Sequence, residues 1–175
     1  MSSQLALGPV FANAAIAPIA VLVVDDQPAV REGLARLLAS GTAVMLAIST
    51  AANCAEALRE AARVQPDLVV IDVDLAGEDG LALIALLPSK TSVLVLTSHC
   101  DAATRARALR LGALAVIGKH ESADLLVRAV ARIAHLHSRG EKSPIPPGAS
   151  THAPMDASSV AAWPSLPESQ GHGHR

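Results

Sequence analysis

Apolar runs that end in polar side chains are the feature that most constrains this chain. One run ends at Asp25-Asp26, another at Asp72, a third at Thr97 and the last at Lys119. Helix-forming segments of about ten or more residues separate the runs, and this alternation predicts right-handed βαβ units and a parallel sheet. Because the carboxyl ends of parallel strands lie along one edge, these polar side chains are expected to share one cleft.

The same pattern predicts an α/β fold with five strands, each followed by a helix. The expected strands cover about 20–25, 43–49, 67–72, 92–97 and 113–118. The expected helices begin near Pro28, Asn53, Gly80, Asp101 and Ser122. The first, third and fourth strands are almost continuously apolar, which is typical of strands that are buried on both faces of a parallel sheet.

Composition sets the expected domain organisation. Hydrophobic residues make up 51% of the 175 residues, which is enough for one core. The last 36 residues hold six of the 11 prolines, and such a segment cannot bury enough surface to offset its ordering entropy. We therefore expect an N-terminal extension at 1–19, a folded domain at 20–138 and a disordered tail at 139–175.

Charge and cysteine content narrow the classes of function. The first 24 residues carry no charge, but no basic segment precedes their apolar run and Pro18 interrupts it, which argues against a signal peptide or membrane span. Cys54 and Cys100 are the only cysteines and are expected to be reduced thiols in the cytoplasm. The net charge of −2 provides no general attraction to nucleic acid, so no direct DNA binding is expected.

The polar residues at the strand ends suit phosphoryl chemistry. Mg²⁺ prefers a few carboxylates together with phosphate oxygens and water. Clustered carboxylates repel one another and would also repel an anionic phosphoryl donor unless cations were present. An ammonium group and a bound cation can neutralise the charge of a phosphoryl group in transfer, so catalysis would rest on positioning and electrostatics.

With these residues in place, the chain resembles the receiver domains of bacterial two-component response regulators. The resemblance is carried by VLVVDDQPAVREGL at 21–34, DVDLAGEDG at 72–80, LTSH at 96–99 and GALAVIGK at 112–119. The first segment is similar to receivers that precede LuxR-type helix-turn-helix domains. The resemblance implies a flavodoxin-like (βα)5 doubly wound sheet with strand order 2-1-3-4-5.

The resemblance also implies a role for each acidic residue. Asp72 would be the nucleophile that accepts a phosphoryl group from a histidine kinase or phosphotransfer protein. Asp25 and Asp26 would bind Mg²⁺, Asp26 more directly, with help from Asp72 and the backbone carbonyl of Asp74. The chain would then be a phosphoacceptor signalling domain rather than an enzyme.

Thr97 and Lys119 complete the site that the resemblance implies, and three neighbouring positions depart from the family pattern. Thr97 would bind the phosphoryl oxygens and transmit the switch, and Lys119 would pair with the phosphoryl group. Ala76 replaces a common proline, which predicts a looser turn. Val116 replaces the usual aromatic residue, so the switch is expected to lack an aromatic step, and His120 replaces a common proline after the lysine.

The leading functional hypothesis is a stand-alone receiver in the cytoplasm that signals through a protein partner. A LuxR-type output domain needs about 60 helix-forming residues, and the segment after 138 offers none with that pattern. No membrane association is expected. A homodimer through the face formed by 101–111, 113–118 and 122–138 is a further candidate assembly that the resemblance suggests.

Two other functions remain open at this point. Asp72 and Asp74 also resemble the DxD nucleophile motif of haloacid-dehalogenase-type phosphatases, although that family places its acidic metal-binding pair after the DxD motif and not before it. A receiver-like binding module that is never phosphorylated is the other alternative. The complete set of five site positions argues against this module, whereas the missing aromatic residue favours it.

Overall fold

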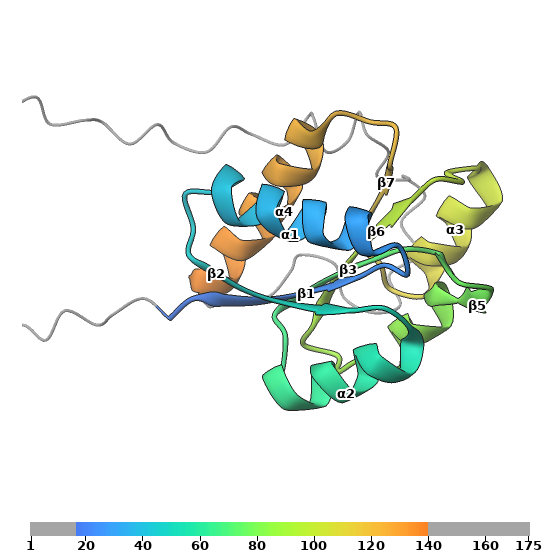
Figure 1. Cartoon of the computed structure of the whole chain (residues 1–175), viewed down its shortest axis with the longest axis horizontal. Helices are drawn as coiled ribbons and strands as arrows, with labels where there is room; N and C mark the ends of the chain where they lie inside the picture. Colours follow the sequence, from blue (N-terminus) through green and yellow to red (C-terminus); the bar gives the residue numbers. More distant parts are fainter. Residues whose placement is uncertain (1–16, 140–175) are drawn as a thin grey trace, which may run out of the picture.

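The computed structural model describes residues 17–139, which contain one parallel sheet of five strands (Figure 1). The strand order is β2-β1-β3-β6-β7. The strands are β1 (Ile19–Val24), β2 (Leu46–Ala51), β3 (Leu68–Ile71), β6 (Ser92–Thr97) and β7 (Ala115–Gly118). Counted among these five strands, the order is 2-1-3-4-5, so the predicted flavodoxin-like doubly wound fold is confirmed.

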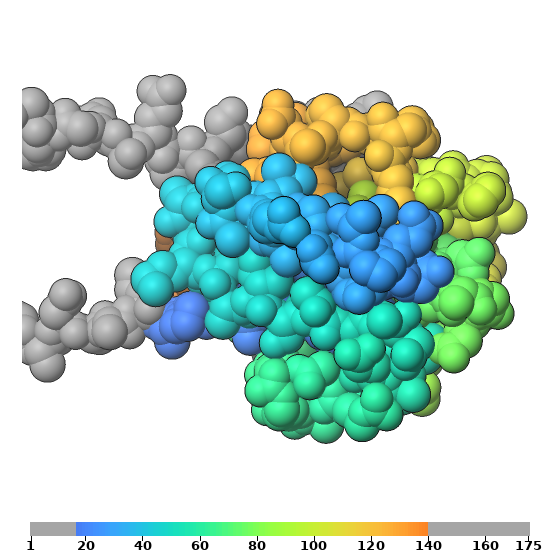
Figure 2. Space-filling view, in the orientation of Figure 1, coloured from blue at the N-terminus to red at the C-terminus, as the bar shows by residue number. Residues whose placement is uncertain are grey.

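Helices cover both faces of this sheet. They are α1 (Pro28–Gly41), α2 (Cys54–Val64), the 3₁₀ helix η1 (Gly80–Leu86), α3 (Ala102–Arg110) and α4 (Ala123–Ser138). Figure 1 shows α1 and α4 together on one face and α2 on the other. In the space-filling view of the same side, α1 and α2 flank the β2 edge (Figure 2). Within 17–139, no helix is both long and apolar enough to cross a membrane.

The core consists of two aliphatic layers, one on each side of the sheet. Alternate residues of β1 point to opposite layers, with Val21 and Val23 on the α1 and α4 side and Leu22 and Val24 on the other. All residues of β3, β6 and β7 are buried. The prediction that the first, third and fourth strands are buried on both faces is thus confirmed, with Ala20 only partly buried.

Two predicted elements differ from the structure in form or position. The third helix is the seven-residue 3₁₀ helix η1, which ends before Pro88. A 3₁₀ helix rises about 2.0 Å per residue against about 1.5 Å for an α-helix, so this short segment covers more of the return path along the sheet. The second strand begins at Leu46 and not at 43, because its pairing with β1 starts where Leu46 faces Ile19.

The turn after Asp72 is an antiparallel hairpin of β4 (Asp74–Leu75) and β5 (Glu78–Asp79). Its two central residues both have positive φ, 56° for Ala76 and 87° for Gly77. Positive φ at both central positions is the signature of a two-residue hairpin turn that matches strand twist. Proline cannot adopt this φ. The predicted loose turn is therefore replaced by a defined hairpin, and its geometry explains why proline does not fit at 76.

Candidate functional site

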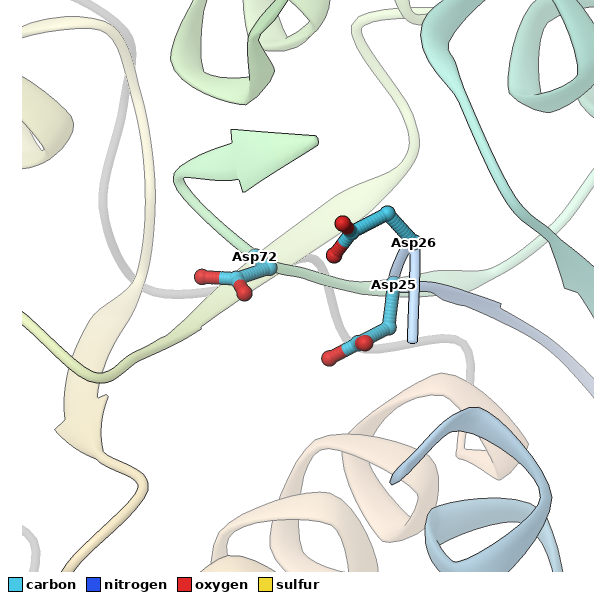
Figure 3. A group of neighbouring side chains, drawn as sticks. All are labelled: Asp25, Asp26 and Asp72. Atoms are coloured by element: carbon cyan, nitrogen blue, oxygen red, sulfur yellow. The ribbon is translucent and has the colours of Figure 1, made fainter. Parts of the chain in front are cut away.

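Three aspartates meet where β1 and β3 end. Asp25 and Asp26 follow β1, Asp72 follows β3, and these two strands are paired neighbours in the sheet. Each residue offers a carboxylate oxygen, and the three oxygens lie within 4.8 Å of one another (Figure 3). Asp25 and Asp72 are 1% and 5% exposed, whereas Asp26 is only partly buried. Adjacent strand ends therefore produce the acidic cluster that the sequence pattern predicts.

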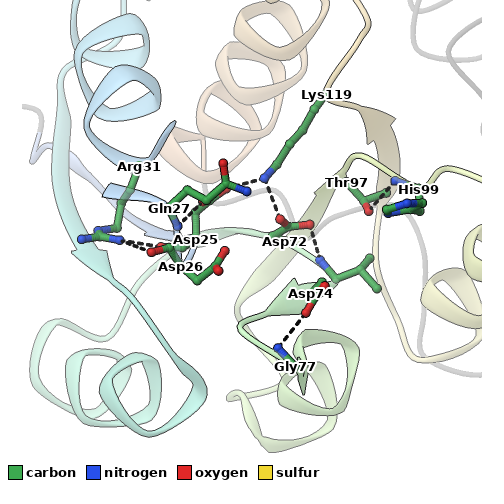
Figure 4. Close-up of polar contacts among 11 residues, drawn as sticks. Asp25, Asp26, Gln27, Arg31, Asp72, Asp74, Gly77, Thr97, His99 and Lys119 are labelled. Atoms are coloured by element: carbon green, nitrogen blue, oxygen red, sulfur yellow. Dashed lines mark hydrogen bonds and ion pairs between the residues drawn. The ribbon is translucent and has the colours of Figure 1, made fainter. Parts of the chain in front are cut away.

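Lys119 joins two of these carboxylates. Its Nζ donates to Asp25 Oδ2 and to Asp72 Oδ2, both at 2.6 Å (Figure 4). Lys119 follows β7, two strands away from β3, so its side chain passes the end of β6 to reach the cluster. The Lys119 amide also donates to the carbonyl of Thr97 at 2.8 Å, which anchors the base of this side chain at the end of β6.

The surroundings keep the Lys119 side chain charged. Burial lowers the pKa of the ammonium, but the hydrogen bonds and negative charges of Asp25 and Asp72 outweigh burial and place the pKa above its ordinary value. Because the pKa of Lys119 is higher in the folded state than in the unfolded state, its ion pairs with Asp25 and Asp72 stabilise the fold. This stabilisation is complete below the ordinary lysine pKa. It is lost as the pH rises through the raised pKa.

Backbone groups hold the second oxygen of each buried carboxylate. Asp25 Oδ1 accepts from the amide of Gln27 at 2.9 Å, and Asp72 Oδ1 accepts from the amide of Val73 at 2.7 Å. The Asp26 carboxylate has no hydrogen-bond donor among the described residues. This carboxylate is suited to bind a cation, because it is partly buried, accepts no hydrogen bond from the described residues and lies within 4.8 Å of two others.

Arg31 supports the turn that carries the first two aspartates. This residue lies in the first turn of α1, and its Nη1 donates to the carbonyl of Asp25 at 2.7 Å and to that of Asp26 at 3.4 Å (Figure 4). Arg31 is not among the site residues predicted from the sequence. A basic residue in the first turn of the helix that follows the acidic pair is the signal that could have found it.

Thr97 lies beside the cluster at the end of β6 and is 1% exposed. Its Oγ1 accepts from the amide of His99 at 3.1 Å (Figure 4). β6 pairs with β3, so Thr97 ends the strand next to the one that Asp72 follows. The hydroxyl is thus held by the loop that follows β6, while the side chain of His99 is exposed.

The Asp74 carboxylate does not belong to this cluster. It is exposed in the hairpin, and its Oδ1 accepts from the amide of Gly77 at 2.9 Å. This hydrogen bond closes the hairpin turn (Figure 4). The role predicted for Asp74 uses its backbone carbonyl, which is independent of this side-chain contact.

The hairpin is tied to helices on both of its sides. Glu78 accepts from the amide of Cys54 at the start of α2, at 3.0 Å. Asp79 pairs with both terminal guanidinium nitrogens of Arg107 on α3, and its Oδ1 also accepts from the Leu81 amide at the start of η1. The hydrogen bonds from Arg107 hold the pKa of the Asp79 carboxyl below its ordinary value, against an opposing effect of burial. Asp79 therefore links the segment after Asp72 to α3.

Both cysteines are free thiols, in line with the expected absence of a disulfide. Burial, followed by the hydrogen bond with Glu78 and its charge, raises the pKa of Cys54 to about 11. The Cys54 thiol is therefore protonated at neutral pH and is a poor nucleophile.

The sequence model of the response regulator receiver domain matches residues 21–131. The chain belongs to this family. Receiver domains are signalling domains that interact with histidine kinases or phosphotransfer proteins and bind Mg²⁺ at an acidic pocket. The matched segment contains Lys119 and the three aspartates of the acidic cluster.

Three comparisons illustrate the similarity. The transcriptional regulatory protein LnrK from Bacillus subtilis is 38% identical over 125 residues, which cover 70% of this chain and 55% of LnrK. The receiver domain of the response regulator NarL from Mycobacterium tuberculosis has a TM-score of 0.59 and 31% identity and covers 67% of this chain and 97% of its own. A Burkholderia pseudomallei response regulator with a phosphorylated aspartic acid and a calcium ion has a TM-score of 0.58 and 27% identity. The match covers 70% of this chain and 69% of that regulator.

Length separates this chain from its curated relatives. The match spans 30% of a protein-glutamate methylesterase from Anaeromyxobacter dehalogenans and 55–56% of two transcriptional regulators. The shared part is the receiver region, so the activities that these names describe do not transfer with the match.

Proposed function

We propose that this chain is a phosphoacceptor receiver that takes a phosphoryl group onto Asp72 from a histidine kinase or phosphotransfer protein. The observation that carries the proposal is Lys119, whose ammonium bonds Asp72 and Asp25 at 2.6 Å inside a cluster of three carboxylates. Removing two charged groups from water carries a desolvation cost that can exceed their mutual attraction, so a buried ion pair adds little net stability. This pair is therefore better explained by a function than by stability. Perturbed ionisable groups of this kind are typical of functional sites.

In the proposed reaction a carboxylate oxygen of Asp72 forms a new bond to phosphorus. The bond between phosphorus and the donor breaks, and the donor leaves with that electron pair. Lys119 is already positioned on Asp72 Oδ2 and would pair with an oxygen of the incoming group. Thr97 would donate a hydrogen bond from its hydroxyl to another phosphoryl oxygen, because it is the last residue of the strand that pairs with β3. Positioning and charge supply the catalysis.

The acidic cluster fits a resident Mg²⁺. Asp26 would be the most direct ligand because its carboxylate has no donor among the described residues, and Asp25 and Asp72 would complete the carboxylate set with the carbonyl of Asp74. When bound, the ion would neutralise charge on the phosphoryl oxygens during transfer. Oxygen ligands of this kind match the preference of hard divalent cations.

The phosphatase alternative fits the structure less well. A DxD mechanism needs the second aspartate at the reacting centre, but the Asp74 carboxylate bonds the Gly77 amide in an exposed hairpin. The receiver family match covers the same residues. The other alternative is a binding module that is never phosphorylated. The following experiment distinguishes such a module from a phosphoacceptor.

Incubation of the full chain with acetyl phosphate and Mg²⁺ should add one phosphoryl group, measured as intact mass. Chelation with EDTA should abolish the addition, because the clustered carboxylates would then repel the anionic donor. A chain that stays at its unmodified mass would contradict phosphoacceptor function. Rapid release of many equivalents of phosphate would favour the phosphatase.

Replacement of Lys119 by methionine should lower the free energy of unfolding by about 3 kcal/mol without Mg²⁺, because it leaves two buried carboxylates without their cation. Methionine preserves most of the apolar stem. Mg²⁺ should restore more stability to this variant than it adds to the wild type, measured by urea denaturation with and without the ion. Lys90→Met is the control, because Lys90 is exposed and precedes the start of β6, at the opposite end of that strand from Thr97. Equal stability of the two variants without Mg²⁺ would contradict the role of Lys119.

The wider biology follows from the proposed chemistry. We propose that the receiver domain comprises residues 20–138 and that the phosphorylated chain acts in the cytoplasm through a protein partner and not through DNA. A homodimer through α3, β7 and α4 would be one such assembly. The structure places Ile19 in β1, one residue before the proposed start of the domain. The rest of the proposed extension at 1–19 and the tail at 139–175 lie almost entirely outside the described residues.

A further inference from the structure

The position that is usually aromatic is occupied here by a small buried residue. Val116 is 1% exposed in β7, where it faces Val95 of β6. A β-branched side chain of this size has few rotamers and cannot swing between buried and exposed positions as a ring can. Residues 17–139 contain no Phe, Tyr or Trp. A change at Asp72 can reach the end of β7 through Lys119, which bonds Asp72 Oδ2, but it needs a further contact to reach α3.

Arg105 makes that contact. From the middle of α3, its Nη1 donates to the carbonyl of Val116 at 3.1 Å, and its Nη2 donates to Cys100 Sγ at 3.0 Å. The guanidinium is partly buried between them. One planar group thus spans the loop after β6, the helix that follows this loop, and the edge strand β7.

Cys100, the loop residue that Arg105 contacts, is close in sequence to the proposed switch residue Thr97. Thr97 Oγ1 holds the amide of His99, and Cys100 is the next residue. A phosphoryl group on Asp72 gives the Thr97 hydroxyl a charged acceptor, which is stronger than a neutral one. Reorientation of Thr97 toward it moves the oxygen to which the His99 amide donates. Cys100 then shifts relative to β7.

The Arg105 guanidinium transmits this shift, because it bonds both Cys100 and the Val116 carbonyl. Its donors have a fixed planar geometry, so Arg105 cannot follow Cys100 and also keep its alignment with the Val116 carbonyl. We propose that Arg105 is the positioning residue that couples Thr97 to α3 and β7, in the role that an aromatic side chain would otherwise have. This inference rests on the proposed function, because it requires Asp72 to accept a phosphoryl group.

Amide chemical shifts of the full chain, with and without beryllofluoride and Mg²⁺, test the coupling in wild type, Arg105→Ala and Arg105→Lys. Both variants should retain the shift changes around residues 25–26 and 72–74. Changes within 102–110 and 115–118 should fall to about half of their wild-type size or less. Lysine keeps the charge and the stem but lacks the planar fork, so it covers the case in which the alanine variant folds poorly.

Arg110→Ala is the matched control, because Arg110 is an exposed arginine on the same helix. It should leave both sets of shift changes at wild-type size. Full-size changes in α3 and β7 with either Arg105 variant, or an equal loss with Arg110→Ala, would overturn the coupling role while leaving the phosphoacceptor proposal intact. Absence of changes around 25–26 and 72–74 in the wild type would overturn the proposed function and this inference with it.

Discussion

Replacement of Asp72 by asparagine should abolish phosphorylation by acetyl phosphate, with no added mass at any time of incubation. The amide oxygen of asparagine is a much weaker nucleophile than a carboxylate, and the substitution also removes one of the three clustered anions. The shape of the side chain is preserved, and its oxygen can still accept from the Val73 amide. The fold should therefore persist, which circular dichroism would verify.

Asp74→Asn is the matched control for this experiment. Asp74 lies two residues further along, carries the same carboxylate and is exposed in the hairpin. Asparagine can still accept from the Gly77 amide and leaves the backbone carbonyl of residue 74 in place. This variant should gain one phosphoryl group like the wild type. Labelling that survives in Asp72→Asn, or that is lost equally in both variants, would show that the nucleophile is misassigned.

The positions of the acidic cluster and of Lys119 are predictable from the sequence because their signals are local. Each residue directly follows an apolar run, and the common edge of a parallel sheet then brings distant segments together without any knowledge of side-chain contacts. Asp25 and Asp72 are 47 residues or more from the Lys119 that bonds them. Their meeting follows from strand order alone.

Contacts between helices and loops carry no comparable signal in the sequence. Arg107 bonds Asp79 across 28 residues, and Arg105 bonds the Val116 carbonyl across 11. Arginines on a helix are usually part of a solvated face, and their partners depend on how the helix is rotated and packed. Sequence patterns predict the helix, but they do not predict which long side chain reaches a neighbouring carbonyl.

The hairpin after Asp72 shows a second limit. Ala76 adopts a positive φ of 56°, which an alanine rarely does, so its identity gives no warning of this backbone. The conformation is imposed by its surroundings: Glu78 bonds α2, Asp79 bonds Arg107, and the Gly80 amide bonds the Val73 carbonyl at 2.7 Å. Family resemblance predicts a turn here, but tertiary contacts decide which turn forms.

Replacement of Gly80 by alanine should be among the most destabilising single substitutions in the domain, at about 3 kcal/mol, the upper part of the usual range for overpacking. A Cβ at this position would lie 2.0 Å from the carbonyl oxygen of Asp72 and 3.0 Å from that of Val73. Both obstacles are backbone atoms, which cannot rotate away as the end of a side chain can. The clash would displace Asp72 itself, so phosphorylation should also slow.

Gly33→Ala is the matched control, with an expected effect of the opposite sign. Gly33 is exposed within α1, and an added Cβ would meet nothing within 4 Å. Alanine in an exposed helix interior is favoured over glycine by about 0.5–1 kcal/mol, so this variant should be slightly more stable than the wild type. Urea denaturation followed by far-ultraviolet circular dichroism measures both changes. If Gly80→Ala unfolds at the same urea concentration as Gly33→Ala, the close approach of residue 80 to the Asp72 carbonyl is wrong.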